Sequence, residues 1–172
     1  LLQYLHLLAL VALLGGCAAP AAYQGMIPTA FDAKRHPQTV SVNVSGGRET
    51  DWNERSQISD ASFMQALVEA IAQSQTFSRV IQDKGADYLL TVVLFSMDQP
   101  MFGLTYTVKL EAGWTLKRAD TGATVWQESI KSEHTSTVGD AFAGVTRLRL
   151  ATEGAARNNI EQGLAKISQL SL

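Results

Sequence analysis

Few side chains in this sequence are suited to covalent or acid–base chemistry. There is one cysteine, Cys17, and of the three histidines only His36 and His134 lie beyond the apolar N-terminal segment. His134 follows Ser132 and Glu133 in a strand-like stretch, where neighbouring residues point to opposite faces. Glu133 is therefore badly placed to orient the imidazole, and we expect His134 to be a solvated residue at a strand end.

The familiar catalytic and cofactor-binding patterns are missing. The sequence has no G-x-S-x-G elbow, no H-E-x-x-H pair, no phosphate-binding G-x-x-x-x-G-K-[ST] loop and no G-x-G-x-x-G turn. Its carboxylates are scattered, without a pair spaced for general acid–base catalysis. A single cysteine leaves no intrachain disulfide and no thiol-rich zinc site. We therefore expect a protein that is not an enzyme, with no catalytic residues, no metal site and no cofactor.

Composition narrows the class further. The chain has 172 residues, a net charge of −2 and 46% hydrophobic residues. That length suits one domain with a real core, and the charge balance argues against a nucleic-acid partner. The apolar content also separates the chain from disordered proteins, which have low hydrophobicity and high net charge.

The N-terminal segment is an apolar run that stops at the cysteine. Leu5–Leu14 is apolar except for His6, and at about ten residues it falls well short of the ~20 that a membrane-spanning helix needs. Its length is typical of the apolar region of a signal peptide, so we expect residues 1–16 to be one. The alternative is a buried helix in which Cys17 is an inert core thiol.

The residues Leu14-Gly15-Gly16-Cys17 resemble the lipobox of bacterial lipoproteins, in which an aliphatic residue and two small residues precede a cysteine. The resemblance implies that the thiol of Cys17 carries a diacylglyceryl group. It also implies that signal peptidase II cleaves between Gly16 and Cys17, and that the new amino group is acylated. Lipoprotein leaders begin with Met and a few Lys or Arg. Because residues 1–16 have neither, we expect the precursor to start further upstream.

The same resemblance bears on localisation. In enteric lipoproteins an Asp after the lipidated cysteine favours the inner membrane, and here that residue is Ala18. We therefore expect a lipid anchor on the periplasmic face of the outer membrane, where several acyl chains bind stably. Residues 17–38 begin without charge or periodicity and are expected to be a flexible tether, followed by a single domain over residues 39–172.

Hydrophobic periodicity predicts the elements of that domain. In chain order they are a strand at Thr39–Val44, a helix after Ser59-Asp60, strands at Phe77–Ile81, Ala86–Met97, Leu104–Leu116 and Thr124–Ser136, and a helix from Asp140 to Leu170. On the last helix the apolar stripe starts at Phe142 and Val145, and Glu153 is expected to pair with Arg157. We expect an α+β fold: an antiparallel sheet of about four to five strands with both helices on one face.

Two short stretches, Ala86–Leu90 and Asp120–Trp126, look like sheet strands of small envelope lipoproteins. Examples are the penicillin-binding-protein activator lipoproteins, the lipopolysaccharide-assembly lipoprotein and the auxiliary lipoproteins of ABC transporters. The resemblance implies an α+β sandwich on an acylated tether, acting without enzymatic activity of its own.

Three places are candidate contact surfaces. Met101 and Phe102 lie in an expected hairpin loop, where they either face a partner or fold back over the core. Trp52 lies in a long polar stretch and either contacts a partner or pins its own loop. Arg149 falls inside the apolar stripe of the last helix, where it either pairs with a carboxylate or meets a partner.

These observations predict a lipid-anchored periplasmic binding or scaffolding lipoprotein, a non-enzymatic accessory of an envelope machine. The expected partners are the membrane, through the N-terminal lipid, and an envelope protein whose identity the sequence leaves open. The alternative is a lipid carrier or chaperone with an apolar cleft between sheet and helices. An open or a filled space around Trp114, Leu116 and Ile160 would discriminate between the two.

Overall fold

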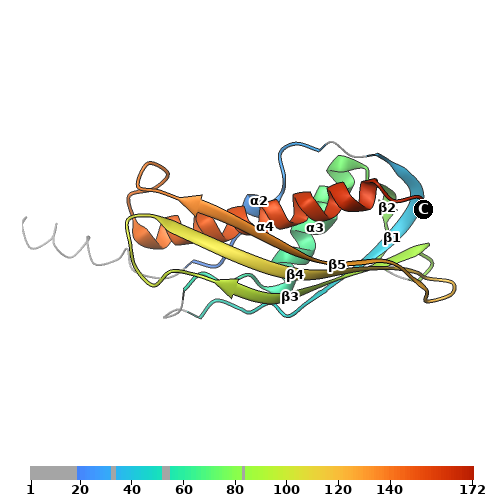
Figure 1. The fold of residues 1–172 in the computed structure, drawn as a ribbon, viewed down its shortest axis with the longest axis horizontal. Coiled ribbons are helices and arrows are strands. Elements are labelled where there is room, and N and C mark those ends of the chain that lie inside the picture. Colours follow the sequence, from blue (N-terminus) through green and yellow to red (C-terminus); the bar gives the residue numbers. More distant parts are fainter. Residues whose placement is uncertain (1–18, 32–33, 52–54, 83) are drawn as a thin grey trace, which may run out of the picture.

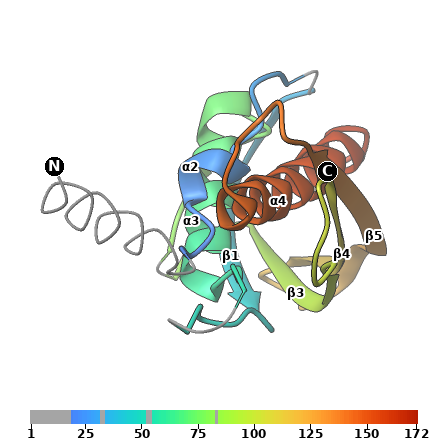
Figure 2. The same ribbon diagram turned by 90° about the vertical axis from the view of Figure 1, so that its left-hand side faces the viewer.

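The computed structural model describes residues 19–31, 34–51, 55–82 and 84–172. The lipobox Leu14–Cys17 and Trp52 lie outside these ranges. In chain order the described elements are α2 (Tyr23–Met26), β1 (His36–Ser45), α3 (Asp60–Ser74), β2 (Phe77–Val80), β3 (Tyr88–Asp98), β4 (Tyr106–Arg118), β5 (Thr124–Ser136) and α4 (Gly144–Ser168). The strands form one twisted sheet, and the helices lie on one face of it (Figure 1 and Figure 2).

The sheet is mixed, so the expectation of a wholly antiparallel sheet is wrong. Its strand order is β2-β1-β3-β4-β5, with β1 parallel to both β2 and β3 and the remaining pairs antiparallel. The cause is α3, which returns the chain to the starting end of β1, so that β2 runs alongside β1 in the same direction. The chain then crosses β1, and β3 pairs with its other edge.

One carboxylate holds that crossing in place. Asp87, just before β3, accepts hydrogen bonds from the backbone N–H of Thr39 at 2.7 Å and from the Thr39 hydroxyl at 2.8 Å. The same bonds hold the pKa of Asp87 below its usual range. The carboxylate of Asp87 therefore serves as the hydrogen-bond acceptor for the backbone N–H of Thr39 at the point where β3 begins beside β1.

The β4–β5 hairpin matches the alternation in the sequence. Val108, Leu110, Ala112 and Trp114 are buried, whereas Lys109, Glu111 and Gly113 between them are exposed or half-exposed. A turn with Gly122 at φ 70° reverses the chain into β5. The expected boundaries of β5, Thr124 and Ser136, are confirmed.

The helix α3 begins as its capping residues predict. The hydroxyl of Ser59 accepts a hydrogen bond from the backbone N–H of Ser62 at 3.2 Å. Phe63, Leu67 and Ile71 lie on one stripe and are fully buried against the sheet.

The helix α4 starts later than expected, at Gly144. Asp140 does not cap it, because its carboxylate instead accepts from the backbone N–H of Thr137 at 2.7 Å and from the Thr137 hydroxyl at 3.1 Å. Phe142 and Val145, expected in the apolar stripe, are exposed. Burial along α4 begins at Arg147 and Leu148.

The expected tether is only partly a tether. Within residues 17–38 the chain forms α2, which packs against α3 and α4, and the side chains of Ala21 and Met26 are buried. The strand β1 also begins inside this range, at His36. Because α2 is short and uncharged, its sequence is difficult to distinguish from that of a linker. The helix is stabilised by the apolar surface that it buries against the domain.

Candidate functional site

The segment that follows the lipobox is docked onto the domain by backbone and carboxylate contacts. The backbone N–H of Ala21 donates to the carbonyl of Gln57 at 3.1 Å. The N–H of Ala22 donates to Oε1 of Glu153 at 2.8 Å. Only Ala18, Ala19 and Pro20 separate Cys17 from this docked segment, so the four residue steps from Cys17 to Ala21 span at most about 14 Å of extended chain.

Glu153 is the centre of this attachment. Its side chain on α4 is buried, and Oε1 also accepts from Arg149 Nη1 at 2.7 Å. The carboxylate packs so closely on Gly25 that a Cβ atom at that position would collide with it. Arg157 donates to the carbonyl of Gly25 at 3.2 Å rather than pairing with Glu153, so the expected Glu153–Arg157 pair is wrong. Of the two readings of Arg149, the carboxylate pair is confirmed.

Met101 and Phe102 lie in the loop between β3 and β4, with 80% and 85% of their surfaces exposed. Leu104 of the same loop is 75% exposed, and Phe142 of the β5–α4 loop is 97% exposed. Both loops lie at the same end of the long axis, on the left of Figure 1. We call Met101, Phe102, Leu104 and Phe142 the apolar tip. The reading in which Met101 and Phe102 fold back over the core is thereby wrong.

The apolar tip and the docked N-terminal segment are joined through one short stretch of chain. Gln99, at the root of the β3–β4 loop, donates through Nε2 to the carbonyl of Ser56 at 2.7 Å and to the hydroxyl of Thr152 at 3.0 Å. Ser56 directly precedes Gln57, which holds Ala21. The N-terminal segment is therefore fastened beside the root of the loop that carries Met101 and Phe102.

Exposure gives a direct stability prediction for this loop. Replacing Met101 and Phe102 together with Ser should leave the melting temperature nearly unchanged, because exposed substitutions usually change stability by less than about 0.5 kcal/mol. Leu110→Ala is the control, since the Leu110 side chain is buried and such a change costs about 2–5 kcal/mol. Thermal denaturation followed by circular dichroism measures both. A fall in the double variant comparable with that of Leu110→Ala would contradict the exposure.

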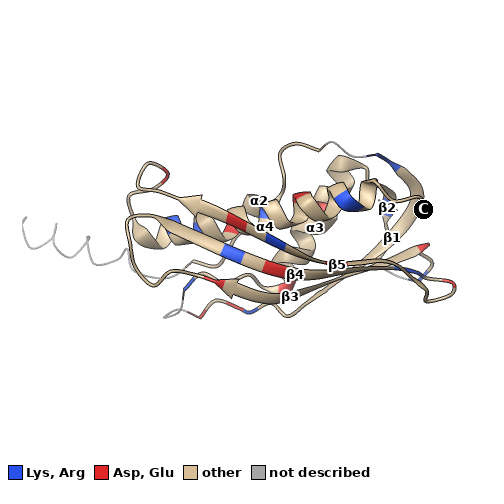
Figure 3. Cartoon of the chain, viewed as in Figure 1, with Lys and Arg blue, Asp and Glu red and all other residues tan. Residues whose placement is uncertain are grey.

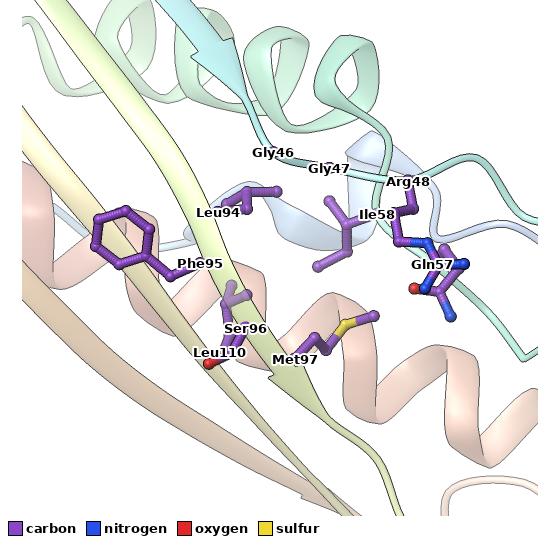
Figure 4. A pocket seen from close by; sticks show the side chains of 10 residues that line it. All are labelled: Gly46, Gly47, Arg48, Gln57, Ile58, Leu94, Phe95, Ser96, Met97 and Leu110. Carbon is purple, nitrogen blue, oxygen red and sulfur yellow. The ribbon is translucent and has the colours of Figure 1, made fainter.

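A groove of about 330 Å³ runs along β3 beyond the end of β1 (Figure 4). Its floor is made by Ile58, Leu94 and Leu110, which are buried, and the polar ends of Arg48 and Gln57 lie together at one side. The groove therefore lies on top of the core. The pairing of β3 with β4 is irregular between Leu94 and Ser96, so that Phe95 has no partner residue on β4. The ring of Phe95 lies on Gly113, on the face of the sheet that the helices leave open.

Neither described histidine has a catalytic arrangement. Nε2 of His36 is buried and lies 3.0 Å from the carbonyl oxygen of Ile167, a structural contact. His134 is half-buried against Gly154 of α4, rather than solvated as expected, and this burial together with the charge of Arg157 lowers its pKa. Over the described ranges, no three His, Cys, Asp or Glu side chains are grouped so as to hold a metal ion.

The space between the sheet and the helices is filled at the place where a lipid carrier was expected to have an apolar cleft. Trp114, Leu116 and Ile160 are fully buried. Nε1 of Trp114 donates to Oδ1 of Asn159 at 2.9 Å, and its ring lies directly on Gly163. A lipid carrier would need this layer to open, so the filled layer favours a binding module. Within the described chain, no helix is long and apolar enough to cross a membrane.

Three residues that matter here were not identified from the sequence: Glu153, Gln57 and Gln99. For Glu153 a signal exists, because it precedes Gly154-Ala155-Ala156 on the inner side of a helix, where a charge needs a partner. Gln57 acts through its backbone carbonyl, and Gln99 acts through an amide in a loop. Neither leaves a pattern in one sequence.

These features define a class of fold: a mixed five-stranded sheet, open on one face and covered on the other by two main helices. No known protein-family model matches the chain, and no curated protein matches it in sequence. Solved structures do match. Protein XCC0632 from Xanthomonas campestris, assigned to the DUF330 family, has a TM-score of 0.63 and 11% identity over 83% of this chain and 90% of that one.

Two further structures have the same fold. Protein CT253 from Chlamydia trachomatis has a TM-score of 0.57 and 9% identity over 77% of this chain and 96% of its own. A minor lipoprotein from Acinetobacter baumannii has a TM-score of 0.52 and 10% identity over 78% and 92%. At these identities the likeness establishes the α+β fold of the chain.

Proposed function

We propose that this protein is a bacterial lipoprotein, anchored through Cys17 to the periplasmic face of the outer membrane. There it acts by binding, as a non-enzymatic accessory of an envelope machine. The observation that carries the proposal is the continuity between lipobox and fold. The chain passes from Leu14-Gly15-Gly16-Cys17 to the docked Ala21 within four residues. The name of the Acinetobacter baumannii neighbour, a minor lipoprotein, supports it.

A docked segment suits an accessory that must sit close to its membrane. A long flexible tether would let the domain reach partners far from the lipid surface. Here Glu153 and Gln57 hold the chain a few residues after Cys17, so the domain stays within reach of proteins embedded in the same membrane. The filled core around Trp114 gives no support to the carrier function.

The proposal predicts that sorting depends on the residue after the lipidated cysteine. In an enteric host, Ala18→Asp should move most of the protein from the outer- to the inner-membrane fraction, because Asp at this position is a retention signal in enteric lipoproteins. Density-gradient separation of membranes and immunoblotting measure this, with Ala18→Ser as the matched control. An equal distribution of both variants would contradict the sorting part of the proposal.

The binding part is tested in the same strains. Chemical cross-linking in intact cells, followed by extraction in a mild detergent, should join the wild-type protein to a defined envelope protein. Ala18→Asp leaves the domain unchanged but displaces it, so the cross-link should be lost. A protein that stays uncross-linked in the wild-type strain would contradict a binding role.

A further inference from the structure

The position and composition of the apolar tip indicate what it meets. Met101, Phe102, Leu104 and Phe142 are all strongly exposed and come from two loops at one end of the molecule. Single exposed apolar residues are ordinary, but several at one end mark a contact surface. The folded domain does not cover these four side chains, so they are free to contact a partner.

The tip has little charge to oppose burial in an apolar surface. Residues 99–105 include no Asp, Glu, Lys or Arg, and this loop is tan along its length in Figure 3. In the β5–α4 loop the one charged side chain, Asp140, is turned back onto Thr137 by two hydrogen bonds. These bonds lower the pKa of Asp140, so its charge is retained but already solvated by the loop itself.

The β5–α4 loop is also held in a fixed shape. Arg147 donates to the carbonyl of Ala141 at 2.9 Å and bonds that of Phe142 as well. Its guanidinium lies 5.5 Å from the ring centre of Tyr106, at the start of β4. The loop backbone is therefore fixed before any contact, which lowers the entropy lost when Phe142 is covered.

The anchor and the tip lie together. Ala21 is held by Gln57, and the neighbouring Ser56 is bonded to Gln99, from which the β3–β4 loop projects. At most about 14 Å of chain links Ala21 to Cys17. A lipid on Cys17 would therefore hold this end of the domain near the bilayer surface.

From this placement we propose that the apolar tip enters the headgroup region of the bilayer that holds the Cys17 lipid, so that the domain has a fixed orientation on the membrane. Phe and Leu side chains, of which the apolar tip has three, are suited to this boundary between headgroups and acyl chains. The inference rests on the proposed lipidation of Cys17. It assigns Met101 and Phe102 to lipid rather than to a protein partner.

The test uses the fact that the chain has one cysteine, which lipidation blocks. Met101→Cys and Phe142→Cys then each supply a single free thiol for an environment-sensitive NBD fluorophore. Ala123→Cys is the matched control, because Ala123 is exposed in the β4–β5 turn at the opposite end. The lipidated proteins are reconstituted in vesicles of phosphatidylethanolamine and phosphatidylglycerol, some of which carry a nitroxide lipid.

The expected result is a blue-shifted emission and strong nitroxide quenching at positions 101 and 142, and neither effect at position 123. Water-like emission at all three positions, in protein that floats with the vesicles, overturns the inference and leaves the anchor intact. Protection that appears only in native membranes also overturns it and assigns the tip to a protein. Protein that does not float with the vesicles contradicts the proposed lipidation, and the inference falls with it.

Discussion

Replacing Trp114 with Ala should cost the domain about 3–5 kcal/mol in free energy of unfolding, the range for removing a buried Trp or Phe. Trp114 is fully buried, its ring covers Gly163, and its indole N–H donates to the amide oxygen of Asn159. The variant would leave a cavity and also deprive that buried oxygen of its donor. For a domain of this size the loss corresponds to a fall in melting temperature of about 6–20 °C.

Trp126→Ala is the matched control, since Trp126 lies on the neighbouring strand and is only half-buried. It should cost clearly less, because less apolar surface is lost and water can fill the space left behind. Urea unfolding of both variants at one temperature gives the comparison. Equal losses would show that the layer between sheet and α4 is not closed around Trp114, and would reopen the carrier function.

Local patterns in the sequence were sufficient for most of the elements. The alternation from Val108 to Leu116 predicts β4, and Ser59 predicts the start of α3, because both are encoded by neighbours along the chain. The direction of β1 relative to its partners was missed. Its Val40, Val42 and Val44 would face the core equally well in a parallel or an antiparallel pair.

The N-terminal part of α4 and the segment around α2 were missed for a different reason. Phe142 fits a helical stripe by spacing, but Asp140 closes a local turn on Thr137 first, so the helix starts after it. Docking of Ala22 depends on Glu153, which is 131 positions away in the chain. Contacts between such distant residues leave no periodic signal in one sequence.

For the candidate contact surfaces, too, local features could be predicted from the sequence and features that depend on distant contacts could not. A turn between two strand patterns predicts the loop but leaves open whether Met101 and Phe102 are exposed or fold back over the core, and the structure shows that they are exposed. Their proximity to the docked N-terminal segment runs through Gln99 and Ser56, and only the fold reveals it. Trp52 stays a prediction, because it lies outside the described residues.

Cys17→Ser should release the protein from membranes almost completely. The apolar run before the lipobox resembles a leader that signal peptidase II removes. Among the residues that the structure describes, no helix is long and apolar enough to cross a bilayer. The exposed tip by itself offers a few apolar side chains, whereas stable anchoring needs the equivalent of two acyl chains. Membrane sedimentation and fatty-acid labelling, with protein expressed behind a complete lipoprotein leader, measure the effect. Ala19→Ser is the control that keeps both label and sedimentation.

The most direct test of lipid anchoring is the mass of the N-terminal peptide of the membrane-bound protein, determined after proteolysis. We expect a peptide that begins at Cys17 and carries a diacylglyceryl group on sulfur and a fatty acyl group on nitrogen. A peptide that continues through Gly15 and Gly16 into Cys17, with an unmodified thiol, would contradict the anchor and the membrane orientation that depends on it.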